Sequence, residues 1–170
     1  MATLPPEADQ VTLLVSPRKP LRLLFVCVGN SCRSQMAEGL AQDMGGERVV
    51  AESAGVSPGD RVAPKAVEVM AELGIDISHH RPKLLTKDAL DRADRSLTMG
   101  CDARDLCPAP WLASSGGWEI EDPVGQGIEK YREVRDDIRR HLERLLEEEG
   151  IPDLLARRER RKASKRRRAR

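Results

Sequence analysis

The chain has 170 residues, of which 39% are hydrophobic and four are aromatic, so we expect one domain with a single core and short extensions. Its 29 basic residues nearly balance its 28 acidic ones, but ten of the basic residues and one acidic residue fall within residues 157–170. That tail has a net charge of +9, which leaves −8 on residues 1–156, and an acidic body disfavours a protein built to hold nucleic acid.

The sequence also predicts a cytoplasmic protein without a membrane span. No apolar run approaches the roughly 20 residues that cross a bilayer, and the N-terminus lacks the charged start and apolar core of a secretory signal. Four cysteines are too few for a disulfide framework in a chain of this size, and their spacing matches no zinc pattern. We therefore expect catalytic or redox cysteines and no bound metal.

The first part of the chain predicts an extension, a strand and a helix. Residues 1–20 contain four prolines, which remove backbone donors, so a loosely ordered extension is expected. Residues 21–28 are almost entirely apolar and too few for a surface helix, which indicates a buried strand of a parallel sheet. Ser34 stands at an N-cap position for a helix over residues 35–44, which Gly45 ends.

Later segments continue this alternation. Strands are predicted at residues 48–54, 95–99 and 118–120, and helices at residues 64–73, 86–90 and 128–149. The pattern predicts an α/β fold over residues 21–149, with an open four-stranded parallel sheet and helices on both faces. Residues 150–170 are expected to form a disordered basic tail, whose contact with nucleic acid or an anionic surface would be weak.

Residues 27–34 form the segment that most clearly suggests chemistry, because Cys27 ends the first predicted strand and Arg33 follows a small polar turn. Consecutive N–H groups of such a turn can surround an anion, and the start of the next helix adds its positive end. Arg33 offers a planar pair of donors for two oxygens of a phosphate-like ion, and positive surroundings favour a reactive thiolate. On this motif alone, Cys27 could also be a buried inert cysteine. The predicted oxyanion-binding residues are Val28, Gly29, Asn30, Ser31, Cys32 and Arg33.

Asp122 is the candidate proton donor. It precedes Pro123 at the end of the fourth predicted strand, and the carboxyl ends of parallel strands meet at the edge where Cys27 lies. Displacement at phosphorus or arsenic benefits from an acid that protonates the departing oxygen. Asp-Pro is equally ordinary in turns, so the residue alone leaves both interpretations open.

Cys101 and Cys107 lie on the loop that leaves the third predicted strand, at the same edge. Two thiols there could attack an adduct of Cys27 and carry oxidising equivalents outward by thiol–disulfide exchange, unless they are unrelated loop cysteines. Cys32 could form a protective disulfide with Cys27 or simply fill space. His80 is expected to be a surface loop residue.

These segments resemble the low-molecular-weight protein tyrosine phosphatase superfamily, and within it the thioredoxin-coupled arsenate reductases. The resemblance covers about residues 21–149. It rests on residues 27–39, 53–55, 64–66, 75–78, 107–108, 118 and 121–123.

The resemblance implies a mechanism in which Cys27 attacks arsenate held by the loop amides and Arg33. Ser34 would support the thiolate, and Asp122 would protonate the leaving hydroxide. A second cysteine would then release arsenite, and a third would present the disulfide to thioredoxin or a similar dithiol; Cys101 and Cys107 would take these places. The resemblance implies a monomer without a tightly bound cofactor. It leaves open whether a potassium ion lies near Asn30, Glu38 and Ser53, as in some relatives.

One spacing departs from the reductases. Six residues separate the two loop cysteines there, but five separate Cys101 from Cys107, and Gly100 occupies the first expected position. The alternative function is a phosphatase for phosphotyrosine or a small phosphoester that uses the same cysteine, arginine and aspartate. Gly125 and Gln126 stand where those phosphatases carry aromatics, and Gln35 replaces their proline, so we expect arsenate reduction with residual phosphatase activity.

Overall fold

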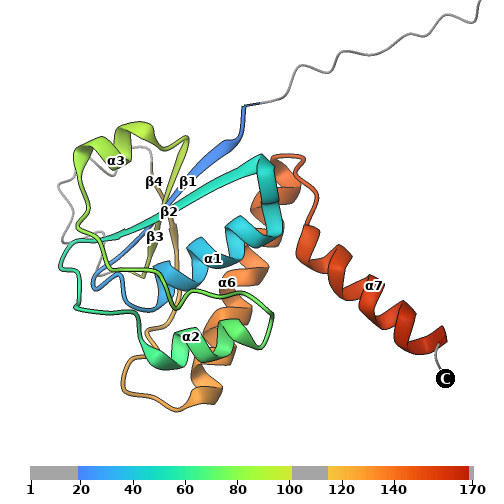
Figure 1. The fold of residues 1–170 in the computed structure, drawn as a ribbon. Coiled ribbons are helices and arrows are strands. Elements are labelled where there is room, and N and C mark those ends of the chain that lie inside the picture. Colours follow the sequence, from blue (N-terminus) through green and yellow to red (C-terminus); the bar gives the residue numbers. More distant parts are fainter. Residues whose placement is uncertain (1–18, 101–114, 169–170) are drawn as a thin grey trace, which may run out of the picture.

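The computed structural model describes residues 19–100 and 115–168, and these contain the predicted parallel sheet (Figure 1). Phe25 of the first strand lies opposite Ser53 on one side and Leu97 on the other, and all neighbouring strands run parallel. The expected α/β class and open four-stranded sheet are confirmed. The strands are β1 (Leu21–Cys27), β2 (Val49–Gly55), β3 (Arg95–Met99) and β4 (Ser115–Trp118), in the order β2-β1-β3-β4.

Helices cover both faces of the sheet, as expected. Alternate residues of β1 point to opposite faces, so Leu23 and Phe25 join the larger core while Leu24 and Val26 join a smaller one. The larger core lies under α1 (Arg33–Gly45), α2 (Pro64–Ala71) and α6 (Ile128–Glu148). The smaller core lies under α3 (Lys87–Arg92), and a short 3-10 turn, Gly46–Arg48, joins α1 to β2.

The edge strand β4 was predicted three residues too late. It spans Ser115–Trp118, and the predicted strand residue Ile120 instead follows it and is buried in the larger core. The segment Ser-Gly-Gly-Trp has little β propensity and no apolar alternation, so its pairing depends on β3. Gly116 lies against Leu97, where an added Cβ would be 3.3 Å from a Leu97 methyl carbon, so a larger residue there would require Leu97 to shift slightly.

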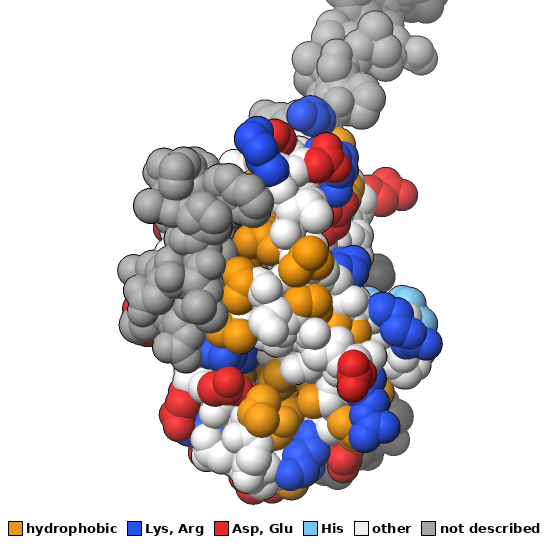
Figure 2. Space-filling model, turned by 90° about the vertical axis from the view of Figure 1, so that its left-hand side faces the viewer, with side chains coloured by type: hydrophobic (Ala, Val, Ile, Leu, Met, Phe, Trp, Pro, Cys, Tyr) orange, Lys and Arg blue, Asp and Glu red, His pale blue; other side chains and the backbone are white. Residues whose placement is uncertain are grey.

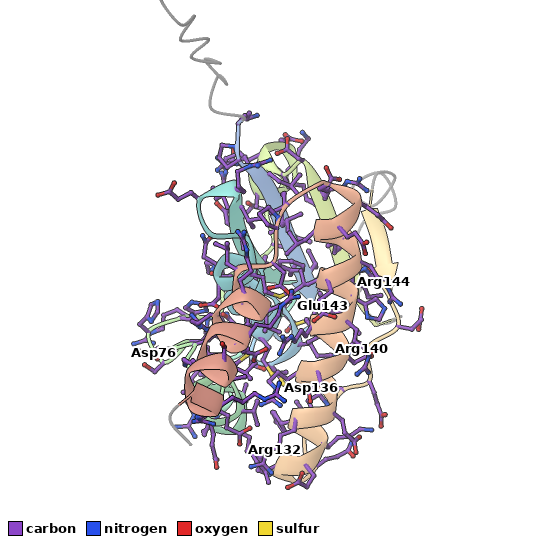
Figure 3. All side chains as sticks on the ribbon, turned by 90° about the vertical axis from the view of Figure 1, so that its right-hand side faces the viewer. Asp76, Arg132, Asp136, Arg140, Glu143 and Arg144 are labelled. Atoms are coloured by element: carbon purple, nitrogen blue, oxygen red, sulfur yellow. The ribbon has the colours of Figure 1, made fainter. Side chains whose placement is uncertain are left out.

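The basic C-terminal segment also differs from the expectation of disorder, because α7 (Leu154–Arg168) is helical. Leu155 is buried in the larger core. Arg158 donates two hydrogen bonds to the carboxylate of Asp43 on α1, both 3.0 Å long, and Arg139 of α6 pairs with Glu159. Figure 3 shows α7 beside α6, and Figure 1 shows its far end leaving the body. The basic composition predicted a solvated segment. Instead, Glu159 and the buried Leu155 hold the first turns of α7 against the rest of the domain.

None of the helices described between residues 19 and 168 is both long and apolar enough to cross a membrane.

Candidate active site

The loop between β1 and α1 is held in a curled shape by residues that bond its carbonyl groups from outside. Asn30 has a positive φ of 46°, a left-handed conformation that asparagine tolerates better than most residues. Three carbonyls of the loop are bonded from outside, an arrangement that suits the binding of an anion by the N–H groups of the loop. The outer donors are the N–H groups of Ser57, Gly59 and Ala63, which bond the carbonyls of Val28, Gly29 and Ser31 at 3.0, 2.9 and 2.7 Å.

Cys27 lies at the floor of this loop with two polar partners. The N–H of Asn30 donates to its Sγ at 3.2 Å, and Ser34 Oγ lies 2.9 Å from the same sulfur. Asn30 Nδ2 in turn donates to Ser34 Oγ at 2.8 Å. Because this hydroxyl already accepts from an amide, its own proton is free to point at the sulfur, and hydrogen bonds of that kind stabilise a thiolate.

The N-cap of α1 is Cys32, and Ser34 is the second residue of the helix, so its predicted capping role is wrong. Its hydroxyl bonds within the loop instead. Serine is common at N-caps, and the sequence could not show that the Cys27 sulfur would bond the same hydroxyl instead.

Arg33 and Asp122 meet across 89 positions of sequence. Arg33 is 7% exposed, and its Nη2 donates to Asp122 Oδ2 at 2.9 Å while its Nη1 donates to the carbonyl of Ile120 at 3.1 Å. The carboxylate is half exposed, and its other oxygen accepts from the N–H of Val124 at 3.1 Å. The segment after β4 therefore brings Asp122 to the edge of the sheet where Cys27 and Arg33 lie.

Gly100 touches the same guanidinium. It has φ of +89°, its N–H donates to the carbonyl of Trp118 at 2.9 Å, and an added Cβ would lie 2.7 Å from Arg33 Nη1. A side chain at position 100 would therefore force Arg33 to move, in addition to straining the backbone. This gives a physical reason for glycine at the position where the resemblance led us to expect a cysteine. Cys101 and Cys107 lie outside the described residues.

Cys32 is buried close to Cys27. Burial raises the pKa of its thiol to about 12, and the nearby Asp122 carboxylate and Cys27 add to the effect. Burial likewise raises the pKa of Tyr131, which hydrogen-bonds to Cys32, to about 12. Both groups therefore stay protonated at neutral pH, and Cys32 is a poor attacking thiol there.

Behind the loop lies a polar cluster that the sequence revealed only in part. Gln35 Nε2 donates to the carbonyl and to Oδ1 of Asn30, at 3.0 and 3.1 Å, and its Oε1 bonds His80 Nδ1 at 2.9 Å. His80 is thus a partner of the loop, against the expectation of a surface residue. Lys83 Nζ lies 3.5 Å from Glu38 Oε2, which also accepts from the Ser53 hydroxyl. The family resemblance pointed to Asn30, Glu38 and Ser53, but no pattern in the sequence pointed to Gln35, His80 or Lys83.

The cluster does not fit a potassium ion. Asn30 Oδ1 already accepts from two N–H groups, those of Gln35 and Lys83, and a lysine ammonium faces Glu38. Within residues 19–100 and 115–168, no three His, Cys, Asp or Glu side chains gather in a way that could hold a metal ion.

The side of the molecule toward which β1 runs carries hydrophobic side chains at its centre and charged ones around them (Figure 2). Leu84, next to Lys83, and Val124, next to Pro123, are each 60% exposed. The loop around Asp122 has Gly125 and Gln126 where an aromatic wall would stand, so the described part of this face offers little for a phenyl ring to stack on.

The comparisons with known proteins place this geometry in a family. Residues 22–155 match the family model for low molecular weight phosphotyrosine protein phosphatase, and the chain belongs to that family. Arsenate reductase 1 of Staphylococcus saprophyticus is 41% identical over 124 residues, which cover 72% of this chain and 94% of that protein.

Solved structures agree with this likeness. A structure of an arsenate reductase in the phosphate binding state has a TM-score of 0.69 and 35% identity, and the match covers 75% of this chain and 98% of that one. The thioredoxin-dependent arsenate reductase of Corynebacterium glutamicum has a TM-score of 0.65 and 31% identity over 78% of this chain and 63% of that one.

Proposed function

We propose that this chain is an arsenate reductase in which Cys27 is the nucleophile and Cys101 and Cys107 carry the disulfide to an external dithiol. The observation that supports it most is the convergence of Cys27, Arg33 and Asp122 at one loop, in a chain 41% identical to an arsenate reductase. Cys101 and Cys107 would then accept the disulfide that forms at Cys27 and pass it to the external reductant.

In the first step the thiolate of Cys27 attacks arsenic and forms an S–As bond. The loop N–H groups and Arg33 hold the equatorial oxygens, and Asp122 gives its proton to the departing hydroxide, which leaves as water. Arg33 exchanges Asp122 for the anion when substrate binds, because the guanidinium that now holds the carboxylate has the geometry to hold two arsenate oxygens. This exchange frees the carboxyl group to take up a proton.

In the second step the thiolate of Cys101 attacks the sulfur of Cys27. An S–S bond forms, the S–As bond breaks, and its electron pair stays on arsenic, which is thereby reduced from As(V) to As(III) and leaves as arsenite. Cys107 then attacks Cys101, so the disulfide moves to the 101–107 pair and Cys27 is released as a thiolate. A dithiol reductant of the thioredoxin type reduces that pair and closes the cycle.

A phosphatase is the alternative, and it fits this site less well. It would use the same Cys27, Arg33 and Asp122, with water as the second nucleophile. The glycine and glutamine after Val124 offer no aromatic side chain at that point of the loop for a phosphotyrosine ring, and two loop cysteines have no part in hydrolysis. Because phosphate and arsenate have nearly the same shape and charge, weak phosphatase activity is expected.

The setting of the reaction follows from this proposal. The enzyme works as a monomer in the cytoplasm, where reduced dithiols are available, and needs no tightly bound cofactor. Neither a membrane nor a nucleic acid takes part in the cycle.

The test is a pair of cysteine variants assayed with arsenate, thioredoxin and thioredoxin reductase. Cys107→Ser should release one arsenite per enzyme and stop, with a Cys27–Cys101 disulfide visible by peptide mapping. Cys101→Ser, its matched counterpart, should release none, because nothing cleaves the S–As bond. If Cys107→Ser turns over repeatedly, the three-cysteine relay is wrong; if the two variants exchange behaviour, the order of the relay is reversed.

A further inference from the structure

Lys83 is bonded through its backbone to the loop between β1 and α1, residues 28–32, which we call the cradle. Its side chain faces Glu38. Its N–H donates to Asn30 Oδ1 at 2.8 Å, and its carbonyl accepts from the N–H of Gly55 at 2.8 Å. The backbone of this residue therefore bridges the cradle and the end of β2. Its ammonium lies 3.5 Å from Glu38 Oε2.

Glu38 needs a positive charge beside it, because its side chain is only 16% exposed. Its Oε2 accepts from Ser53, and His80 Nδ1 lies 4.0 Å from Oε1. Burial lowers the pKa of His80, so its ring is neutral at neutral pH and does not supply the charge. The lysine does, and its half-exposed side chain keeps the ammonium partly hydrated.

The cluster controls the direction of the hydrogen bonds that reach the nucleophile. Asn30 Oδ1 accepts from the N–H of Lys83 and from Gln35, so the amide must turn its Nδ2 toward Ser34. Ser34 Oγ accepts that bond, which leaves its proton for Cys27 Sγ, 2.9 Å away. Loss of the charge beside Glu38 would loosen the segment that fixes Asn30, and the thiolate would lose a directed donor.

We infer that Lys83 is a built-in cation and a positioning residue: it neutralises Glu38, orients Asn30 and Ser34 toward Cys27, and makes the site independent of potassium. An external cation would need carboxylate and amide oxygens that are free to bind it, and here Glu38 and Asn30 Oδ1 are already engaged. The inference rests on the proposed function only in taking Cys27 as the nucleophile.

The test measures the thiol of Cys27 directly, without arsenate. The full-length protein and its Lys83→Met variant are alkylated with iodoacetamide across a range of pH, and modification of the Cys27 peptide is followed by mass spectrometry. Parallel series use potassium chloride or tetramethylammonium chloride at equal ionic strength. In the unmodified protein the rates should be the same in both salts. In Lys83→Met, alkylation at pH 7 should slow by roughly three- to tenfold, as expected when one directed hydrogen bond to the sulfur is lost.

Three further variants separate positioning from general damage. Lys83→Arg keeps the charge and should alkylate like the unmodified protein, and Glu38→Gln with Lys83→Met removes both charges and should recover most of the rate. Lys87→Met removes an exposed lysine of the α3 ion pair and should change nothing. The inference is overturned if Lys83→Met matches the unmodified protein, if the unmodified protein responds to potassium, or if Lys83→Arg is as slow as Lys83→Met. An intact alkylation pattern with no arsenate turnover would instead count against the proposed function.

Discussion

Substitution of Gly100 by alanine tests how closely the site is built around Arg33. The new Cβ would lie 2.7 Å from Arg33 Nη1, at a backbone φ of +89°. The guanidinium must move, so its bonds to the Ile120 carbonyl and Asp122, 3.1 and 2.9 Å long, would be broken or stretched. Arg33 gives up Asp122 when the anion binds, so the affinity that is lost is that of a hydrogen bond from the displaced guanidinium to an anion oxygen. Hydrogen bonds to charged groups contribute about 1.5–3 kcal/mol, so arsenate or phosphate affinity should fall roughly 10- to 150-fold.

Gly74→Ala is the matched control for the backbone. Gly74 has φ of +75° with nothing within 4 Å of an added Cβ, so it carries the left-handed penalty without the collision. Gly74→Ala should lose about 1–2 kcal/mol of unfolding free energy from the left-handed backbone alone, and Gly100→Ala should lose at least as much, but only Gly100→Ala should bind the anion weakly. Thermal unfolding gives the first quantity, and inhibition constants for phosphate give the second. Equal phosphate affinity in Gly100→Ala and the unmodified protein would refute the idea that Gly100 makes room for Arg33.

Three further outcomes are expected. Asp122→Asn should lower kcat for arsenate reduction by roughly 10²–10⁴-fold, the usual contribution of a general acid, while single-turnover burst analysis should show a slowed first step; an unchanged kcat would contradict the assignment. At pH 8 iodoacetamide should modify Cys27 and leave Cys32 unlabelled, because burial raises the pKa of Cys32 to about 12; equal labelling in the folded protein would be inconsistent with this. Arg158→Ala should lower the midpoint of thermal unfolding by roughly 2–4 °C, since about 1 kcal/mol is expected for this two-bonded pair, whereas Lys87→Ala should have almost no effect; similar shifts for the two variants would argue against docking of α7.

The sheet and the cradle could be predicted because each has a strong local signal. The apolar run that forms β1 is too short for a helix, and the segment from Cys27 to Arg33 places a cysteine and a short polar turn between a strand and a helix. Parallel strands end at a common edge of the sheet, and this rule alone predicts that Asp122 lies near the cradle. Its hydrogen bond to Arg33 agrees with that prediction.

The rest of the structure depends on contacts between distant segments, which local patterns do not encode. β4 pairs through a Gly-Gly backbone that has almost no strand propensity, so its position follows from β3. The support of Asn30 comes from Lys83, 53 positions away, through a backbone N–H that any residue but proline could supply. The docking of α7 depends on the ion pair between Arg158 and Asp43. In the sequence, nothing distinguishes Arg158 from the other arginines of the basic segment.

The function of the two loop cysteines is the part of the proposal that separates a reductase from a phosphatase with the same Cys27, Arg33 and Asp122. A steady-state comparison tests it most directly: turnover of arsenate with thioredoxin, thioredoxin reductase and NADPH against turnover of an aryl phosphate by the same enzyme preparation. We predict sustained, thioredoxin-dependent reduction of arsenate with a much larger kcat/KM than for the aryl phosphate. Efficient hydrolysis of the aryl phosphate without sustained arsenate reduction would contradict the account.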